Sequence, residues 1–204
     1  MKLKTTVAAM VVSSLALAGV AFAEEAKKDE KKPAAMEMPK PGPEHKKLGY
    51  FVGTWNLTGE MKPGPMGPGG KMTGTSNCSW FDGGYAVVCK DSGKGPMGPM
   101  KGMGILTYDN EDKMYEYFGI DNMGMAEKAE GKVENDVWTY TSNEKMNGKA
   151  FKGRYTISNV KPDGYDFKFE TSEDGNAWST MMEGKYAKAG AAKKAAAKPE
   201  EKKS

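Results

Sequence analysis

The chain has 204 residues, and its 30 Lys and Arg nearly balance its 27 Asp and Glu, which leaves a formal net charge of +3. A charge this small does not indicate nucleic-acid binding, and the single apolar run near the N-terminus excludes a polytopic membrane protein. Two Cys and one His exclude a zinc-finger array, a multi-histidine metal enzyme and a dense disulfide scaffold.

The first 23 residues have the features of a secretory signal peptide. Lys2 and Lys4 precede an uncharged run, and the Ala-Phe-Ala sequence at 21–23 supplies the small-x-small pattern of a cleavage site. The run is shorter than the roughly 20 residues of a membrane span. We therefore expect a cleaved signal peptide over residues 1–23, a mature protein that begins near Glu24, and a periplasmic or secreted location.

Two segments of biased composition flank the part of the chain that can fold. Residues 24–43 and 188–204 consist mostly of Lys, Glu, Ala and Pro, with no periodic apolar positions that would bury surface. Such segments do not offset the entropy cost of ordering, so we expect a disordered linker and a disordered tail. A Lys-rich tail can also act as a basic arm that contacts the cell envelope. Residues 44–187 are left to form one domain.

The domain shows the periodicity of strands. Aromatic residues at 165, 167 and 169 alternate with charged residues, and a similar alternation runs from Trp178 to Tyr186. Turn signals such as Gly83-Gly84, Asp163-Gly164 and Asp174-Gly175 recur at short intervals. The pattern predicts about ten strands, beginning near residues 51, 72, 85, 102, 113, 124, 136, 149, 164 and 177, after one short helical turn at 44–50. The expected fold is all-β, an antiparallel up-and-down barrel, with a flattened sandwich as its structural rival.

The two cysteines flank the Gly83-Gly84 turn. A tight turn there pairs residue 82 with 85, 80 with 87, and Cys78 with Cys89, which places the two thiols directly opposite each other. Opposed strand residues lie within disulfide range, and an exported compartment is oxidising, so we predict a Cys78–Cys89 disulfide. A metal-binding thiol pair is the alternative.

Strand alternation also selects candidates for the interior of the barrel. A closed barrel of this size is wide enough to hold a small apolar or amphipathic molecule, but periodicity defines a face and does not reveal whether the space is hollow or filled. The candidate interior and ligand-binding residues are Trp55, Leu57, Trp80, Phe118, Tyr155, Tyr165, Phe167, Phe169 and Trp178.

Several short motifs follow one another in an order that resembles a known bacterial family. Pro43-Glu44-His45 and Leu48 precede Gly53-Thr54-Trp55, and Tyr108-Asp109 and a terminal Met182-x-Gly184-x-Tyr186 follow. This is similar to a family of exported or cytosolic proteins of unknown function with a calycin-like barrel of the lipocalin or nitrobindin type. The resemblance implies the same barrel over roughly residues 43–186.

The resemblance also implies roles for individual residues. In lipocalin-like barrels the first-strand Trp, here Trp55, closes one end and packs beneath an Arg near the last strand. This chain has Lys185 and Lys188 there, and its only Arg is Arg154, so we expect the cation-π partner to be replaced or lost. Related haem-binding barrels use a late His, whereas no His follows His45. Haem ligation through His is therefore disfavoured, and we expect His45 to cap or hydrogen-bond at the helical turn.

The domain contains two copies of a Gly-Pro-Met-Gly-Pro loop, at residues 64–68 and 95–99. The second copy continues as Met97-x-x-Met100-x-x-Met103, and three thioether sulfurs are suitable ligands for Cu(I). Methionine is also an adaptable apolar residue that suits a ligand portal, and Gly and Pro are ordinary turn residues. Plain loop composition, an apolar portal and a copper site remain open.

No pattern indicates catalysis. Acidic residues are plentiful, but no spacing selects a general acid and base, and the sequence contains no serine elbow, phosphate loop or metal-ligand cluster. We therefore predict a protein that is not an enzyme, has no cofactor and binds a small apolar or amphipathic molecule. The alternatives are a periplasmic Cu(I) or Ag(I) protein that uses the Met loop and an envelope interaction protein that acts through its Lys-rich tails.

Overall fold

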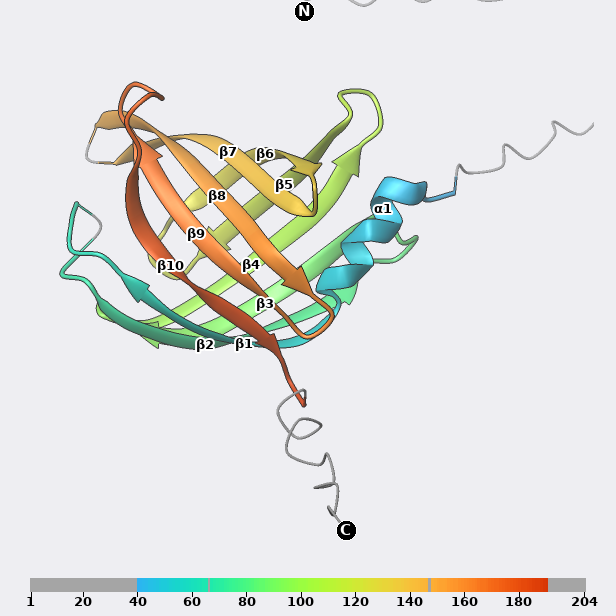
Figure 1. Cartoon of the computed structure of the whole chain (residues 1–204), viewed down its shortest axis with the longest axis horizontal. Helices are drawn as coiled ribbons and strands as arrows, with labels where there is room; N and C mark the ends of the chain where they lie inside the picture. The colour runs from blue at the N-terminus through green and yellow to red at the C-terminus, as the bar shows by residue number, and fades with distance from the viewer. Residues whose placement is uncertain (1–39, 66, 147, 191–204) are drawn as a thin grey trace, which may run out of the picture. The chain divides into compact units, whose positions relative to one another are not determined.

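The computed structural model describes residues 40–65, 67–146 and 148–190. The predicted signal peptide, the linker up to residue 39, Met66 in the first Gly-Pro-Met loop and the tail from residue 191 lie outside these residues. Within them, the chain forms one short helix, one 3-10 turn and ten strands (Figure 1). Their bounds are α1 Pro43–Lys47, η1 Leu48–Phe51, β1 Gly53–Met61, β2 Gly70–Trp80, β3 Ala86–Gly95, β4 Gly98–Asp109, β5 Met114–Asp121, β6 Ala126–Glu134, β7 Val137–Met146, β8 Lys149–Lys161, β9 Gly164–Ser172 and β10 Ser179–Lys188.

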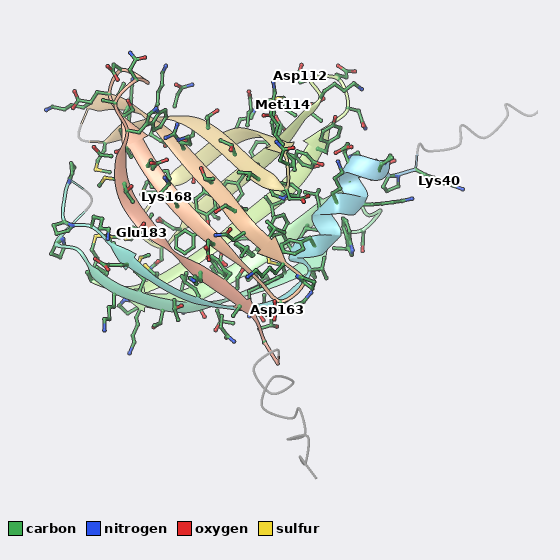
Figure 2. All side chains as sticks on the ribbon, in the orientation of Figure 1. Lys40, Asp112, Met114, Asp163, Lys168 and Glu183 are labelled. Carbon is green, nitrogen blue, oxygen red and sulfur yellow. A yellow bond between two sulfur atoms is a disulfide. The ribbon has the colours of Figure 1, made fainter. Side chains whose placement is uncertain are left out.

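The ten strands close into an antiparallel barrel. Each strand pairs with its neighbours in sequence, and β1 pairs with β10 from Trp55 opposite Lys188 to Met61 opposite Met182. The predicted all-β, up-and-down barrel with a single N-terminal helical turn is confirmed, and the flattened sandwich is wrong. Charged residues such as Lys168 and Glu183, which are partners across β9 and β10, project from the outer surface (Figure 2).

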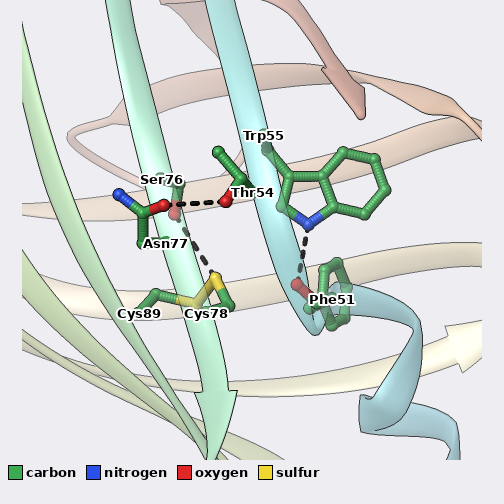
Figure 3. Close-up of a disulfide and its surroundings, with 7 residues drawn as sticks. All are labelled: Phe51, Thr54, Trp55, Ser76, Asn77, Cys78 and Cys89. Atoms are coloured by element: carbon green, nitrogen blue, oxygen red, sulfur yellow. Dashed lines mark hydrogen bonds between the residues drawn. A yellow bond between two sulfur atoms is a disulfide. The ribbon is translucent and has the colours of Figure 1, made fainter. Parts of the chain in front are cut away.

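The predicted disulfide is confirmed, and so is the hairpin register that predicts it. Trp80 pairs with Val87 and Cys78 pairs with Cys89, whose Cα atoms lie 4.0 Å apart. Gly83 and Gly84 both have positive φ angles, which glycine adopts without the strain that a Cβ would cause. The disulfide ties β2 to β3 and faces the barrel interior beside Ser76 (Figure 3).

The helical segment closes one end of the barrel. Leu48 and Phe51 are buried against Trp55, Trp138 and other residues of the main core cluster. The indole Nε1 of Trp55 donates a hydrogen bond of 2.7 Å to the carbonyl oxygen of Phe51, which joins the turn to the first strand (Figure 3). Lys188 Nζ lies 5.1 Å from the centre of the Trp55 ring, so the cation-π partner expected from the resemblance is replaced by a lysine.

His45 stabilises the start of this segment. It is 2% exposed, and its Nδ1 accepts a hydrogen bond of 3.3 Å from the backbone N–H of Gly42. Its ring packs edge-on against Tyr85 and Tyr108. The expectation that His45 hydrogen-bonds at the helical turn is therefore confirmed, and the imidazole belongs to the plug of the barrel.

Candidate ligand cavity

The barrel contains an internal cavity of about 390 Å³. This volume is within the range of about 300 to 1,000 Å³ that is typical of small-molecule sites. Aromatic side chains and methionines form most of the wall. The aromatic residues that line the cavity are Phe51, Trp55, Tyr117, Tyr140, Tyr155, Tyr165, Phe169 and Tyr186.

Inward-facing glycines explain why this barrel is hollow. Strands β2 to β5 place five glycines on the cavity wall, namely Gly74, Gly93, Gly102, Gly104 and Gly119. The Tyr117 ring lies flat across two of them, because a Cβ at Gly104 or Gly119 would come within 3 Å of that ring. One wall is therefore thin, and the aromatic residues of β8 to β10 fill the opposite wall.

Most of the predicted interior residues face the barrel interior. Trp55, Leu57, Tyr155, Tyr165 and Phe169 line the cavity. Phe167 also faces inward, but it packs against Met61 and Met72 in a second core cluster and does not line the cavity. The remaining three candidates, Trp80, Phe118 and Trp178, do not lie in the interior, and each has a different physical reason.

Phe118 lies on the outer face because its neighbour Tyr117 takes the inward position. Adjacent strand residues face opposite sides, and only Tyr117 has the two glycines that make room for its ring. Phe118 is 38% exposed, and Lys128 Nζ lies 5.8 Å from its ring centre. The prediction of an interior Phe118 was therefore wrong.

Trp178 is displaced by a β-bulge. The β9–β10 register shifts between Thr180 and Met182, so the alternation that is correct from Met182 to Tyr186 does not extend back to residue 178. The Trp178 ring instead packs under Arg154, whose Cζ lies 4.0 Å from the ring centre. Arg154 also holds Glu170 through two hydrogen bonds of 2.8 and 3.0 Å.

Strand alternation places Trp80 on the inward face of β2, but the residue lies at the end of the strand, beyond the cavity. It packs against Gly49 in the helical turn and is 39% exposed. Its prediction as an interior residue was wrong, because the strand ends at this residue and the barrel wall does not enclose it.

The methionines gather at the end of the barrel opposite the helix. Seven of them line the cavity: Met61, Met97, Met100, Met103, Met123, Met125 and Met182. Four of these have exposed side chains, namely Met97, Met103, Met123 and Met125. Met114, which Figure 2 labels near the β4–β5 turn, lies at the helix end instead. We call the open end the methionine mouth.

The three methionines of the second Met loop come from two different elements. Met97 belongs to the β3–β4 turn, whereas Met100 and Met103 are part of β4, opposite Gly93 and Lys90 respectively. Because strand residues three apart face opposite sides, Met100 lies on the inward face of β4 and Met103 on its outward face, although both contribute atoms to the cavity lining. The three residues therefore do not share one loop, and Cu(I) binding by them stays a prediction.

Three carboxyl groups that the sequence interpretation did not select lie on the inner face. Asp91 on β3 and Glu127 on β6 line the cavity, and Glu144 on β7 has the inward parity of Tyr140 and Ser142. Burial, together with the charge of Glu144, raises the pKa of Glu127 to about 7. Burial also raises the pKa of Asp91, against a hydrogen bond from Ser76 that lowers it. The alternation Glu127-x-Ala129-x-Gly131-x-Val133, with lysines and glutamates between, was the signal that could have identified Glu127.

A closed antiparallel barrel with a helical plug at one end and an apolar cavity within defines a calycin-like barrel. The chain belongs to the family described as "Protein of unknown function (DUF1579)", which matches residues 40–188. No curated protein matches this sequence.

Solved structures share the fold at low sequence identity. The crystal structure of Rv2717c from M. tuberculosis is 14% identical, with a TM-score of 0.53 over 73% of this chain and 99% of that one. The S-type phycobiliprotein lyase CPES from Guillardia theta is 9% identical, with a TM-score of 0.51 over 70% and 90% of the two chains. A de novo designed fluorescence-activating β-barrel gives 16% identity and a TM-score of 0.40 over 69% and 95%. The first two likenesses show the barrel fold.

Two further properties concern the described residues alone. None of their helices is long and apolar enough to cross a membrane. Nor do any three of their His, Cys, Asp or Glu side chains form a group that would hold a metal ion.

Proposed function

We propose that this protein is exported and binds a small apolar or amphipathic molecule inside its barrel. The observation that carries the proposal is the cavity of about 390 Å³ with its largely apolar wall. A hollow of this size within an otherwise packed barrel leaves the wall residues without packing partners, and an apolar molecule would supply those contacts. The exposed methionines at the mouth suit a passage for ligands of varied shape, because the thioether side chain is flexible and polarisable.

The cavity is tested with a cavity-filling variant and a matched control. Leu57 lines the cavity, and its neighbour Thr58 is exposed on the outer face of β1. We expect the mature protein to bind the neutral fluorescent probe Nile red and the apolar competitor decanol to displace it. Leu57→Trp should abolish binding, and Thr58→Trp should leave it unchanged. Equal binding by a folded Leu57→Trp variant would overturn the proposal.

Export is tested separately by cell fractionation and intact-mass measurement of the protein from its own host. The expected result is a species in the envelope or medium fraction whose mass corresponds to a chain that begins near Glu24. An uncleaved chain confined to the cytosol would refute the export part of the proposal and leave the cavity part standing.

A further inference from the structure

The interior of the cavity is not uniformly apolar, and the charged side chains that face it are carboxylates. Asp91 and Glu127 line it from β3 and β6. Lys101 is the only lysine or arginine on the cavity wall within the described residues, and its position on β4 faces outward, between the inward Met100 and Gly102. Among the described residues, the cavity therefore presents carboxyl groups to a ligand without an inward-facing Lys or Arg to neutralise them.

Glu127 on β6 and Glu144 on β7 lie opposite each other on adjacent strands. The β6–β7 register pairs Ala129 with Ser142, so the inward positions two residues further along are Glu127 and Glu144. Tyr117 lies beside them on β5. Its pKa is raised mainly by burial and to a smaller extent by the charges of Glu127 and Asp91, so its hydroxyl stays protonated. The polar groups thus form a band on the inner wall, between the helical plug and the methionine mouth.

Two oxygens on this inner wall lack a hydrogen-bond partner among the described residues. They are Tyr140 Oη and Glu144 Oε1, and both atoms are shielded from solvent. Tyr140 is 4% exposed and lines the cavity. A buried polar atom without a partner destabilises the protein, so such atoms on the inner wall indicate a bound group that satisfies them.

Asp121 at the mouth differs from these carboxyl groups. It accepts hydrogen bonds of 2.9 Å from the backbone N–H groups of Met123 and Met125, so it stabilises the β5–β6 turn. The carboxylates available to a ligand are therefore those on the cavity wall and not those at its rim.

We propose that the ligand of this cavity is an apolar molecule with a protonated amine, whose ammonium group is bound by Glu127, with Glu144 and the tyrosine hydroxyls around it. This inference rests on the proposed function and adds the chemical class of the ligand. An ammonium group donates several hydrogen bonds to carboxylate and phenol oxygens, and its charge compensates for the desolvated carboxylate. A divalent metal ion is disfavoured, because no three acidic, His or Cys side chains of the described residues come together to hold one.

The charge state of Glu127 predicts how binding depends on pH. The titratable groups beside it are Glu144 from β7 and Tyr117 from β5, and Asp91 from β3 acts on the same tyrosine. A primary amine stays protonated through neutral pH, so only the carboxyl group must lose its proton before the ion pair forms. Because the pKa of Glu127 is about 7, amine affinity should fall roughly tenfold for each pH unit below it.

The experiment compares three probes that share a ten-carbon chain and differ only in the head group. Decylammonium, decanol and decanoate are titrated calorimetrically into the mature protein at pH 8. We expect decylammonium to bind at least about tenfold more tightly than decanol, and decanoate to bind most weakly. In Glu127→Gln the preference for the amine should vanish together with its pH dependence, while decanol affinity is retained.

Glu130→Gln is the matched control, because Glu130 is exposed on the outer face of the same strand. It should behave like the natural sequence. If decanoate or decanol binds as tightly as decylammonium, or if Glu127→Gln keeps the preference for the amine, the inference is overturned while the proposed function stands. If none of the three probes binds and Nile red also fails to bind, the proposed function fails as well.

Discussion

Removing the Cys78–Cys89 disulfide should destabilise the barrel by an amount set mainly by the loop that it closes. The two cysteines are 11 residues apart in sequence. For a loop of this length, the chain-entropy relation gives about 2.8 kcal/mol at 25 °C. In a domain of about 150 residues, that loss lowers the melting temperature by about 5 to 10 °C.

Urea denaturation of the mature protein with and without a reductant measures this contribution directly. The double variant Cys78→Ala/Cys89→Ala is the control, since the reductant should not change its midpoint. The midpoint of the natural sequence should fall on reduction while the slope of the transition stays similar. A reduced protein whose free energy of unfolding stays within about 0.5 kcal/mol of the oxidised value would refute the reasoning. That outcome would mean that the hairpin already restricts the unfolded chain.

Three further changes should alter stability. The pKa of Glu127 is about 7 in the folded protein and exceeds its ordinary value of 4.5, so the stability of the ligand-free protein should fall as pH rises between these values. Glu127→Gln should therefore add about 2 kcal/mol at pH 8 and little at pH 4, and equal gains at the two pH values would contradict this. Burial raises the pKa of Glu170, but hydrogen bonds from a lysine and an arginine outweigh that effect and lower it. The contribution of Glu170 to the free energy of unfolding is therefore present above about pH 4.5 and lost in acid. Glu170→Gln should lower the free energy of unfolding by about 1 to 2 kcal/mol at pH 7, and this loss should disappear below the folded pKa in an acid titration followed by circular dichroism. Lys188→Met removes the cation over Trp55 and should lower the free energy of unfolding, measured by urea denaturation, by about 0.5 to 1 kcal/mol, whereas Lys188→Arg should retain the stability. An unchanged free energy of unfolding in Lys188→Met would show that the contact does not stabilise the protein.

Local sequence signals predicted the course of the strands well. Paired glycines and Asp-Gly turns mark places where the chain must reverse, and the Gly83-Gly84 turn alone was enough to specify the register that joins Cys78 to Cys89. These features depend on residues close together in the chain, so they can be derived without knowing how distant strands meet.

The errors in the predicted interior arose where the alternation is interrupted. Trp178 lies beyond the bulge before Met182, and a bulge leaves no clear mark in a run of Ser, Thr and Met. Tyr117 and Phe118 are adjacent aromatic residues, and which of them faces inward depends on Gly104 in the neighbouring strand and Gly119 in the same strand. Such information comes from lateral packing, which a single sequence does not reveal.

Hollowness was undecided for a related reason. The inward positions of β2 to β5 carry glycines, such as Gly102 and Gly104, that the sequence alone also allows to be interpreted as ordinary turn or bulge residues. Only the closed barrel shows that these positions fall on one wall and face the aromatic side chains of Tyr155 and Phe169.

The pairing of β1 with β10 has a consequence for how the barrel folds. The seam joins Trp55 to Lys188, residues more than a hundred positions apart, whereas the other ladders join strands that follow one another. Each hairpin can form early at a small loop-closure cost, but the seam can form only after the last strand is available. Until then both β1 and β9 have unpaired edges, which are the surfaces most prone to aggregation. Folding of this chain is therefore completed at its C-terminal strand, and a truncation before Ser179 should leave an open, association-prone sheet.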